Sequence, residues 1–207
     1  GEDGFWMSRD RFCQVLDRIV AMGPDAPQIT FDDGNAADVD IALPELTRRG
    51  LTATFFLLSA RLGQPGCLKQ VDVTALAEAG HRIGLHGADH VDWRGLDAAA
   101  RAREFVAARD SLSALAGHPV DQAAEHLGLY DRQTLQDLRQ LGLAALYSSV
   151  RGLAGTADFI RPRNCLEGGM DDGALEAAVR GRVRGLRRAR RVFGVARKRM
   201  LPIRVRP

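Results

Sequence analysis

The chain has 207 residues, of which 45% are hydrophobic and 27% charged, and its formal net charge is +3. This length suits one well-filled core and is too short for two ordinary domains. No apolar run approaches the roughly 18 residues of a membrane span, and no signal-like segment opens the chain, which argues against a membrane-spanning protein. The three cysteines lie far apart without a C-x-x-C pair, which argues against a disulfide framework and against a zinc-thiolate site. We therefore expect a soluble, cytoplasmic protein.

Strand-like and helix-like segments alternate from residue 8 to residue 164. The first predicted helix covers 8–23, with Ser8 as its N-cap. Apolar, β-rich runs predict short strands at 26–31, 52–58, 81–87, 119–126, 143–150 and 158–164. Apolar residues at helical spacing predict helices at 36–50, 71–80, 95–117 and 131–142. Regular alternation indicates an α/β domain over 1–179 with a parallel sheet, either doubly wound or closed as a barrel.

Two adjacent carboxylates and a glycine, Asp32-Asp33-Gly34, end the first predicted strand. In both architectures ligands bind at the carboxyl ends of the strands. An isolated Asp-Asp-Gly is most often a simple turn, in which glycine lets the backbone reverse. Adjacent carboxylates also suit hydrolysis, because one can bind a metal ion while the other takes a proton from water.

His86 and His90 follow the third predicted strand in the stretch GLHGADH. Two imidazoles and one carboxylate form a sound site for a divalent metal with positions left open. A lone His-x-x-x-His is weak evidence, since one surface and one core histidine would give the same pattern. Its place on the same rim as the Asp-Asp pair favours a metal site.

The combination of TFDDG and HGADH, about fifty residues apart, resembles the polysaccharide deacetylase family of carbohydrate esterases. This resemblance covers residues 9 to about 165 and implies a distorted (β/α) barrel with fewer than eight complete units. It also implies that Asp32 is the catalytic base and that Asp33, His86 and His90 hold one divalent metal ion. Zinc is the first choice, with cobalt, nickel or iron as alternatives.

The third motif of the family is altered in AAEHLGLYD, residues 123–131. Alanine stands where the family has the arginine that braces the base, and Glu125 and His126 replace prolines. Leu127 takes an aromatic position, but the oxyanion contact expected there comes from a backbone N–H, which leucine also supplies. The late histidine that protonates the leaving amine has no counterpart. His126 and Glu125 are the candidates for this acid; in the alternative, Glu125 is solvated and His126 fills space.

Three further residues near strand ends are candidates for substrate contacts. Arg161 and Arg163 follow the last strand, where either can pair with Asp32 or with an anionic group of the substrate. Exposure beside a loop is the alternative for each. Trp93 can stack on a sugar face or simply pack in the core.

The C-terminal segment is strongly basic. Residues 180–207 hold 12 of the 29 Arg and Lys residues and no Asp or Glu, so residues 1–179 carry 17 basic against 26 acidic residues, a net charge of −9. An apolar stripe along this segment predicts an amphipathic basic helix that packs on the barrel or lies on an anionic membrane surface. Nucleic acid binding is not expected, because no recognisable module is present.

The resemblance implies a metal-dependent hydrolase that removes an N-acetyl group from an amino sugar. One alternative is a carbohydrate-binding protein on a deacetylase scaffold that has lost its activity, which the missing arginine and late histidine favour. Another is a deformylase or amidase that acts on a lipid-linked or small substrate. Retention of both aspartates and both histidines favours catalysis, since a binding protein gains little from the Asp-Asp pair.

Overall fold

The computed structural model describes residues 6–153, 155 and 158–182. It contains one six-stranded sheet in which every pair of neighbours is parallel and the strands follow the order of the chain. The strands are β1 (Ile29–Asp33), β2 (Ala53–Leu57), β3 (Arg82–Leu85), β4 (Gln122–Ala124), β5 (Ala145–Ser148) and β6 (Ile160–Pro162). All six strands lie within segments predicted from the sequence or extend them by two residues.

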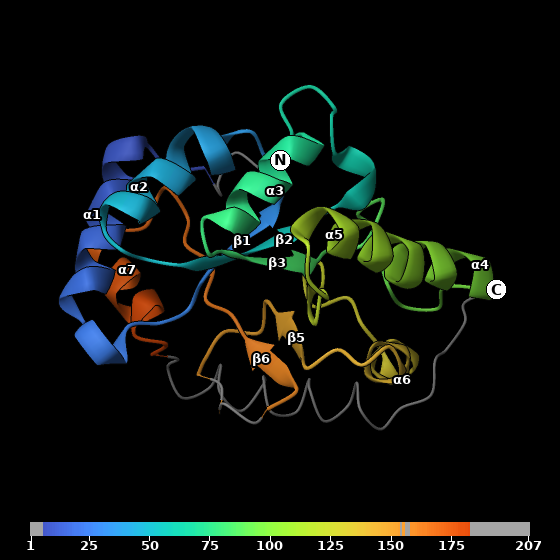
Figure 1. Ribbon diagram of the computed structural model, residues 1–207. Coiled ribbons are helices and arrows are strands. Elements are labelled where there is room, and N and C mark those ends of the chain that lie inside the picture. The colour runs from blue at the N-terminus through green and yellow to red at the C-terminus, as the bar shows by residue number, and fades with distance from the viewer. Residues whose placement is uncertain (1–5, 154, 156–157, 183–207) are drawn as a thin grey trace.

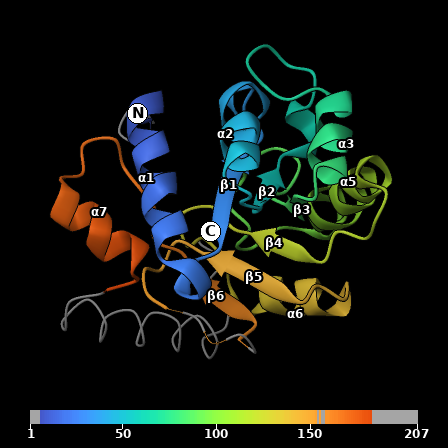
Figure 2. The ribbon, with the colours of Figure 1, turned by 60° about the vertical axis from the view of Figure 1, so that its left-hand side comes forward.

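The sheet curls from β1 to β6 instead of remaining open and flat (Figure 2). A doubly wound sheet reverses its strand order at a switch point, whereas here each strand lies next to its successor. The protein is therefore a partial (β/α) barrel with six strands, which confirms the distorted barrel implied by the family resemblance and rules out the doubly wound alternative. All strand carboxyl ends lie on one rim, because all six strands are parallel.

Helices cover the outer side of the sheet (Figure 1). The α-helices are α1 (Arg9–Ala21), α2 (Leu43–Arg48), α3 (Gln70–Glu78), α4 (Ala98–Arg101), α5 (Ala108–Ala116), α6 (Arg132–Gln140) and α7 (Asp172–Val179). Short 3-10 turns occur at η2 (Gly23–Asp25) and η4 (Ser59–Arg61). The predicted N-cap Ser8 is confirmed, because it accepts a hydrogen bond from the Arg11 N–H, and Asp131 caps α6 in the same way by accepting from the Thr134 N–H. Helix α7 was not predicted.

Two of the predicted helices contain a π-helical turn. The turns are η3 (Asp38–Ala42), which leads into α2, and η5 (Ala102–Ala107), which joins α4 to α5. Such turns are rare and occur often at functional sites, because the extra residue re-aims neighbouring side chains. Each turn brings a buried carboxylate toward the sheet, Asp38 from η3 and Glu104 from η5.

Alternate residues of the strands fill two different layers. Phe55 and Leu57 of β2 belong to the large core between sheet and helices, while Phe56 points to the opposite face and packs with Tyr147. Gly84 of β3 leaves the room for this, because a Cβ there would lie 2.3 Å from the Phe56 ring. The inner layer of the barrel is thus packed with side chains beneath the rim.

Helices long and apolar enough to span a bilayer are lacking among the described residues. The amphipathic basic helix predicted for the C-terminal segment lies in residues 183–207, outside the described part of the chain, so it stays a prediction.

Candidate active site

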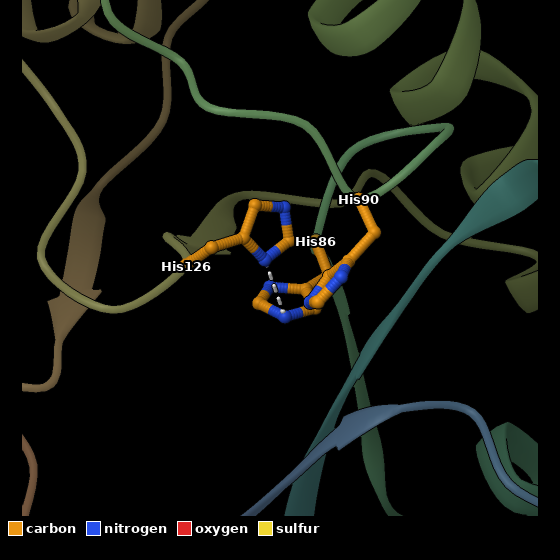
Figure 3. Close-up of side chains that lie close together, drawn as sticks. All are labelled: His86, His90 and His126. Carbon is orange, nitrogen blue, oxygen red and sulfur yellow. Dashed lines mark hydrogen bonds between the residues drawn. The ribbon is translucent and has the colours of Figure 1, made fainter. Parts of the chain in front are cut away.

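The rim of the barrel gathers most of the residues predicted to carry the chemistry. Asp32 and Asp33 end β1, His86 directly follows β3, and Glu125 directly follows β4. His90 and His126 lie on the loops after β3 and β4. Figure 3 shows the rings of His86, His90 and His126 turned toward one another.

Asp33 and the two histidines of GLHGADH place their donor atoms around one point. Asp33 Oδ1 lies 3.3 Å from His86 Nε2 and 3.5 Å from His90 Nε2. His86 Nδ1 lies 2.7 Å from the Ala124 carbonyl oxygen, to which it donates its hydrogen. The lone pair of His86 is then on Nε2 and faces the carboxylate, as a metal-binding imidazole requires.

These residues fit a divalent metal ion. Asp33 Oδ1 is buried and accepts no hydrogen bond from the described residues, although it is the oxygen that faces both histidines. Buried carboxylate oxygens are normally satisfied, so this atom marks a place where a cation belongs. Oxygen and imidazole nitrogen donors suit zinc and the neighbouring transition metals, which agrees with the predicted ligand set.

Asp32, next in the chain to Asp33, is held by an arginine from the other edge of the sheet. Arg163 Nη1 and Nη2 lie 2.5 and 2.7 Å from the two oxygens of Asp32, a bidentate pair. Burial alone raises the pKa of Asp32, but the charges of Arg163 and His86 outweigh it, and the net pKa is lowered. Asp32 is therefore an ionised carboxylate in fixed orientation, as a general base must be. Arg163 supplies the bracing charge that the third motif lacks.

The charge pattern also affects Asp33 and His86, two of the predicted ligands. Burial raises the pKa of Asp33, but the neighbouring imidazole of His86, followed by that of His90, outweighs it, and the net pKa lies below its usual value. Burial lowers the pKa of His86, yet Asp32, Asp33 and the Ala124 carbonyl raise it above its usual value. A proton would therefore compete with a metal ion for His86.

Backbone strain is concentrated at this rim. Within the described ranges, three non-glycine residues have positive φ: Asp33 (76°), His90 (61°) and Leu127 (49°). Left-handed conformations are costly for such residues and persist where the surroundings enforce them, commonly at active sites. All three were predicted from the sequence as functional, two as ligands and one as an oxyanion donor.

Buried carboxylates that the sequence did not single out hold the loops of the rim. Glu104 is 2% exposed and accepts hydrogen bonds from the N–H groups of Ala88 (2.8 Å) and Asp89 (3.1 Å), just before His90. Asp38 accepts from the Asn35 N–H after β1. Burial raises the pKa of Asp38 to about 8; the Asn35 N–H opposes this, while Asp32 and Asp33 add to it. Both carboxylates come from the π-helical turns, which a sequence pattern does not reveal.

Glu125 supports the loop after β4. It is 0% exposed, and its two oxygens accept hydrogen bonds from the Leu129 N–H (2.9 Å) and the Ser149 N–H (3.2 Å). The expectation of a solvated Glu125 is therefore wrong. Both of its oxygens are occupied by backbone amides, and the bond from Leu129 spans the turn that carries Leu127. The Leu127 side chain is 76% exposed at the rim.

His126 is buried and lies against both histidines. Its ring centroid is 4.0 Å from those of His86 and His90, and its Nδ1 lies 3.0 Å from His86 Nε2 (Figure 3). Burial and the neighbouring imidazoles lower the pKa of His126 to about 3. The ring thus belongs to the histidine cluster, which favours the functional interpretation over a histidine that only fills the place of a proline.

The remaining two candidates, Arg161 and Trp93, pack against aromatic rings, and the Trp93 ring centroid lies 5.7 Å from that of His126. Arg161 donates a hydrogen bond to the Tyr147 hydroxyl, 3.0 Å away, and its guanidinium lies over the Tyr147 ring. Trp93 is 2% exposed and packs edge-on against Phe105. Of the two interpretations left open for Trp93, this burial favours packing, because no ring face is open to a sugar.

Comparison with known proteins connects this geometry to a family. Residues 21–146 match the family model for polysaccharide deacetylase, which is more than half of the chain. The Bacillus subtilis (strain 168) protein YheN is 31% identical over 135 residues, covering 65% of this chain and 46% of YheN. A chitin deacetylase from Pestalotiopsis sp is 34% identical over 94 residues, 45% of this chain and 31% of that protein. The chain thus spans less than half the length of these curated relatives.

A solved structure supports the fold independently. The Streptococcus pyogenes deacetylase PplD, determined in complex with acetate, superposes with a TM-score of 0.73 at 20% sequence identity. The match covers 84% of this chain and 87% of that one. At this identity the likeness establishes the partial barrel and its strand order.

Proposed function

Because the chain belongs to the polysaccharide deacetylase family, we propose that its rim removes an N-acetyl group from an amino sugar by metal-dependent hydrolysis. One observation carries the proposal: an arginine-braced carboxylate, Asp32, adjoins a cluster in which Asp33 Oδ1 lies 3.3 and 3.5 Å from two imidazole nitrogens. A binding protein has no use for an ionised base beside such a cluster. This arrangement favours a hydrolase over a carbohydrate-binding protein without activity.

Asp33, His86 and His90 would hold the divalent ion, which when bound supplies Lewis acidity that polarises an amide carbonyl and makes water a nucleophile near neutral pH. Asp32 takes the proton of the attacking water. Arg163 keeps Asp32 ionised and fixes both of its oxygens. Asp32 therefore does not need to reorient when it takes the proton. The Leu127 N–H is the proposed donor to the oxyanion that develops on the acetamide oxygen.

The amine that leaves needs a proton to complete the hydrolysis. Asp32, once it has taken a proton from water, lies at the cluster and can carry it. His126 also lies there, but its lowered pKa makes it the weaker carrier. Glu125 is less suited, because both of its oxygens hold backbone amides. Acetate and a free amino sugar are the products.

Release of acetate from N-acetylated chito-oligosaccharides by the metal-loaded protein tests the proposal. Asp32→Asn should lower turnover by at least about 100-fold, since a positioned general base contributes about 10²–10⁴-fold, while metal stoichiometry stays that of the wild type. Asp121→Asn, which breaks only an exposed pair with Arg82, is the matched control and should retain activity. Unchanged turnover in Asp32→Asn would refute the assignment of the base.

The same assay on a formamide analogue addresses the alternative substrate class. Faster release of formate than of acetate would redirect the proposal to a deformylase, with the same residues in the same roles.

A further inference from the structure

His126 reaches the cluster from a different element than the other histidines. His86 and His90 come from β3 and its loop, whereas His126 follows β4, and all three rings meet with ligand nitrogens within 4.8 Å of one another (Figure 3). His126 is 6% exposed, so solvent does not account for its orientation. Its Nδ1, and not its Nε2, is the atom that faces His86.

Three of the distances between donor atoms suit a single ion. Donors bound to zinc at about 2.0–2.1 Å lie roughly 2.9–3.4 Å apart when they are adjacent on the coordination polyhedron. His126 Nδ1 lies 3.0 Å from His86 Nε2, and Asp33 Oδ1 lies 3.3 Å from the same nitrogen. Asp33 Oδ1 and His90 Nε2 are 3.5 Å apart. The contact made by His126 therefore has the length of a ligand-to-ligand edge.

The hydrogen-bond pattern of His86 argues in the same direction. Because His86 Nδ1 donates to the Ala124 carbonyl, its Nε2 carries a lone pair. If His126 donated an N–H to that lone pair, the lone pair of His86 would be engaged in a hydrogen bond and could not bind the metal. If His126 Nδ1 instead presents its own lone pair, both nitrogens can share one cation, and the short contact is then favourable.

Given the metal site of the proposed function, we infer that His126 is a fourth protein ligand, so that the centre consists of three imidazoles and one carboxylate. A ligating Nδ1 has no proton to give, and the proton for the leaving amine then comes from Asp32. Four protein donors also fill the positions of a tetrahedral ion, so an ion that catalyses here must accept a higher coordination number.

Binding of Co²⁺ to the metal-free protein tests this inference without using activity. We expect His126→Ala to bind Co²⁺ more than about 100-fold more weakly than the wild type, because even the outer partners of metal ligands cost 10–100-fold. The visible ligand-field spectrum of the bound Co²⁺ should change as well, and added imidazole should restore it. His118→Ala removes an exposed histidine and is the matched control, with affinity and spectrum of the wild type.

His126→Phe keeps a ring in the same space and separates the loss of a ligand from the loss of packing. Weak binding and an altered spectrum in both variants, with far-ultraviolet circular dichroism unchanged, would support the inference. Wild-type affinity and spectrum in either folded variant would overturn it and leave His126 as an acid. Failure of the wild type to bind Co²⁺ would instead refute the metal site itself.

Discussion

Replacing Glu104 by glutamine should weaken both the fold and the metal site, although Glu104 is not a metal ligand. Its carboxylate is 2% exposed and accepts the N–H groups of Ala88 and Asp89, which directly precede His90. Glutamine has nearly the same shape but only one acceptor oxygen. One of the two N–H groups would therefore face an NH₂ group, and the other would lose a charged partner.

The expected magnitude follows from these two hydrogen bonds. Bonds to a charged group contribute about 1.5–3 kcal/mol, and a buried donor left without a partner costs about 1–3 kcal/mol. Because glutamine still accepts one bond, we expect a net loss of about 2–4 kcal/mol. For a protein of this size each kcal/mol lowers Tm by about 2–4 °C, so Tm should fall by about 4–16 °C.

Thermal unfolding and metal titration together form the assay. In Glu104→Gln the loop that carries His90 is loosened, and metal affinity should fall by about 10–100-fold, as for other outer supports of metal ligands. Glu167→Gln is the matched control, because Glu167 forms an exposed pair with Arg151 and should change stability by less than about 1 kcal/mol. Wild-type Tm in Glu104→Gln, or a lowered Tm with unchanged metal affinity, would refute the reasoning.

Three further substitutions probe other parts of the account. Gly87→Ala should destabilise the protein more than Gly80→Ala. Both glycines have left-handed φ, but only at position 87 would the new Cβ lie 2.4 Å from a carboxylate oxygen, that of Glu104. Equal Tm values for the two variants would contradict this expectation. Arg163→Met should lower the free energy of unfolding by about 1–3 kcal/mol in urea, less than the 3–5 kcal/mol of a fully buried pair because Asp32 is partly exposed. Hydrogen bonds from arginines lower the pKa of Glu45 to about 2, so its contribution to stability is complete above its ordinary value near 4.5 and is lost as the pH falls toward 2. The stability difference between wild type and Glu45→Gln should shrink over that range, and a constant difference would contradict it.

Most of the fold could be predicted from local sequence patterns. Each strand is a short β-rich run. The predicted N-cap is equally local, because the Ser8 side chain accepts a hydrogen bond from Arg11, only three residues along the chain. The choice of a curled sheet over a doubly wound one depended on strand order, which periodicity does not encode. The π-helical turns at Asp38–Ala42 and Ala102–Ala107 were missed because they keep helical spacing of apolar residues while adding one residue to a turn.

Some residues of the site could likewise be predicted from local sequence, whereas others depend on contacts between distant parts of the chain. Asp32, Asp33, His86 and His90 could be found because strand ends in a parallel sheet share one rim. The pairing of Arg163 with Asp32 could be predicted only as one alternative beside contact with a substrate or exposure. The pair joins the two edge strands of the sheet across 131 residues, and a local sequence pattern does not show such a contact. Glu104 looks like an ordinary helix residue in the sequence, because its partners are backbone amides that carry no sequence signal.

Metal titration of the metal-free protein tests most directly the central claim that Asp33, His86 and His90 hold a divalent ion. Calorimetry with Zn²⁺ on the wild type and on His86→Ala, with His118→Ala as the control, measures stoichiometry and affinity together. We expect one ion per chain in the wild type and in the control, and a large loss of affinity in His86→Ala. Absence of binding in the wild type, or equal binding in His86→Ala, would contradict it.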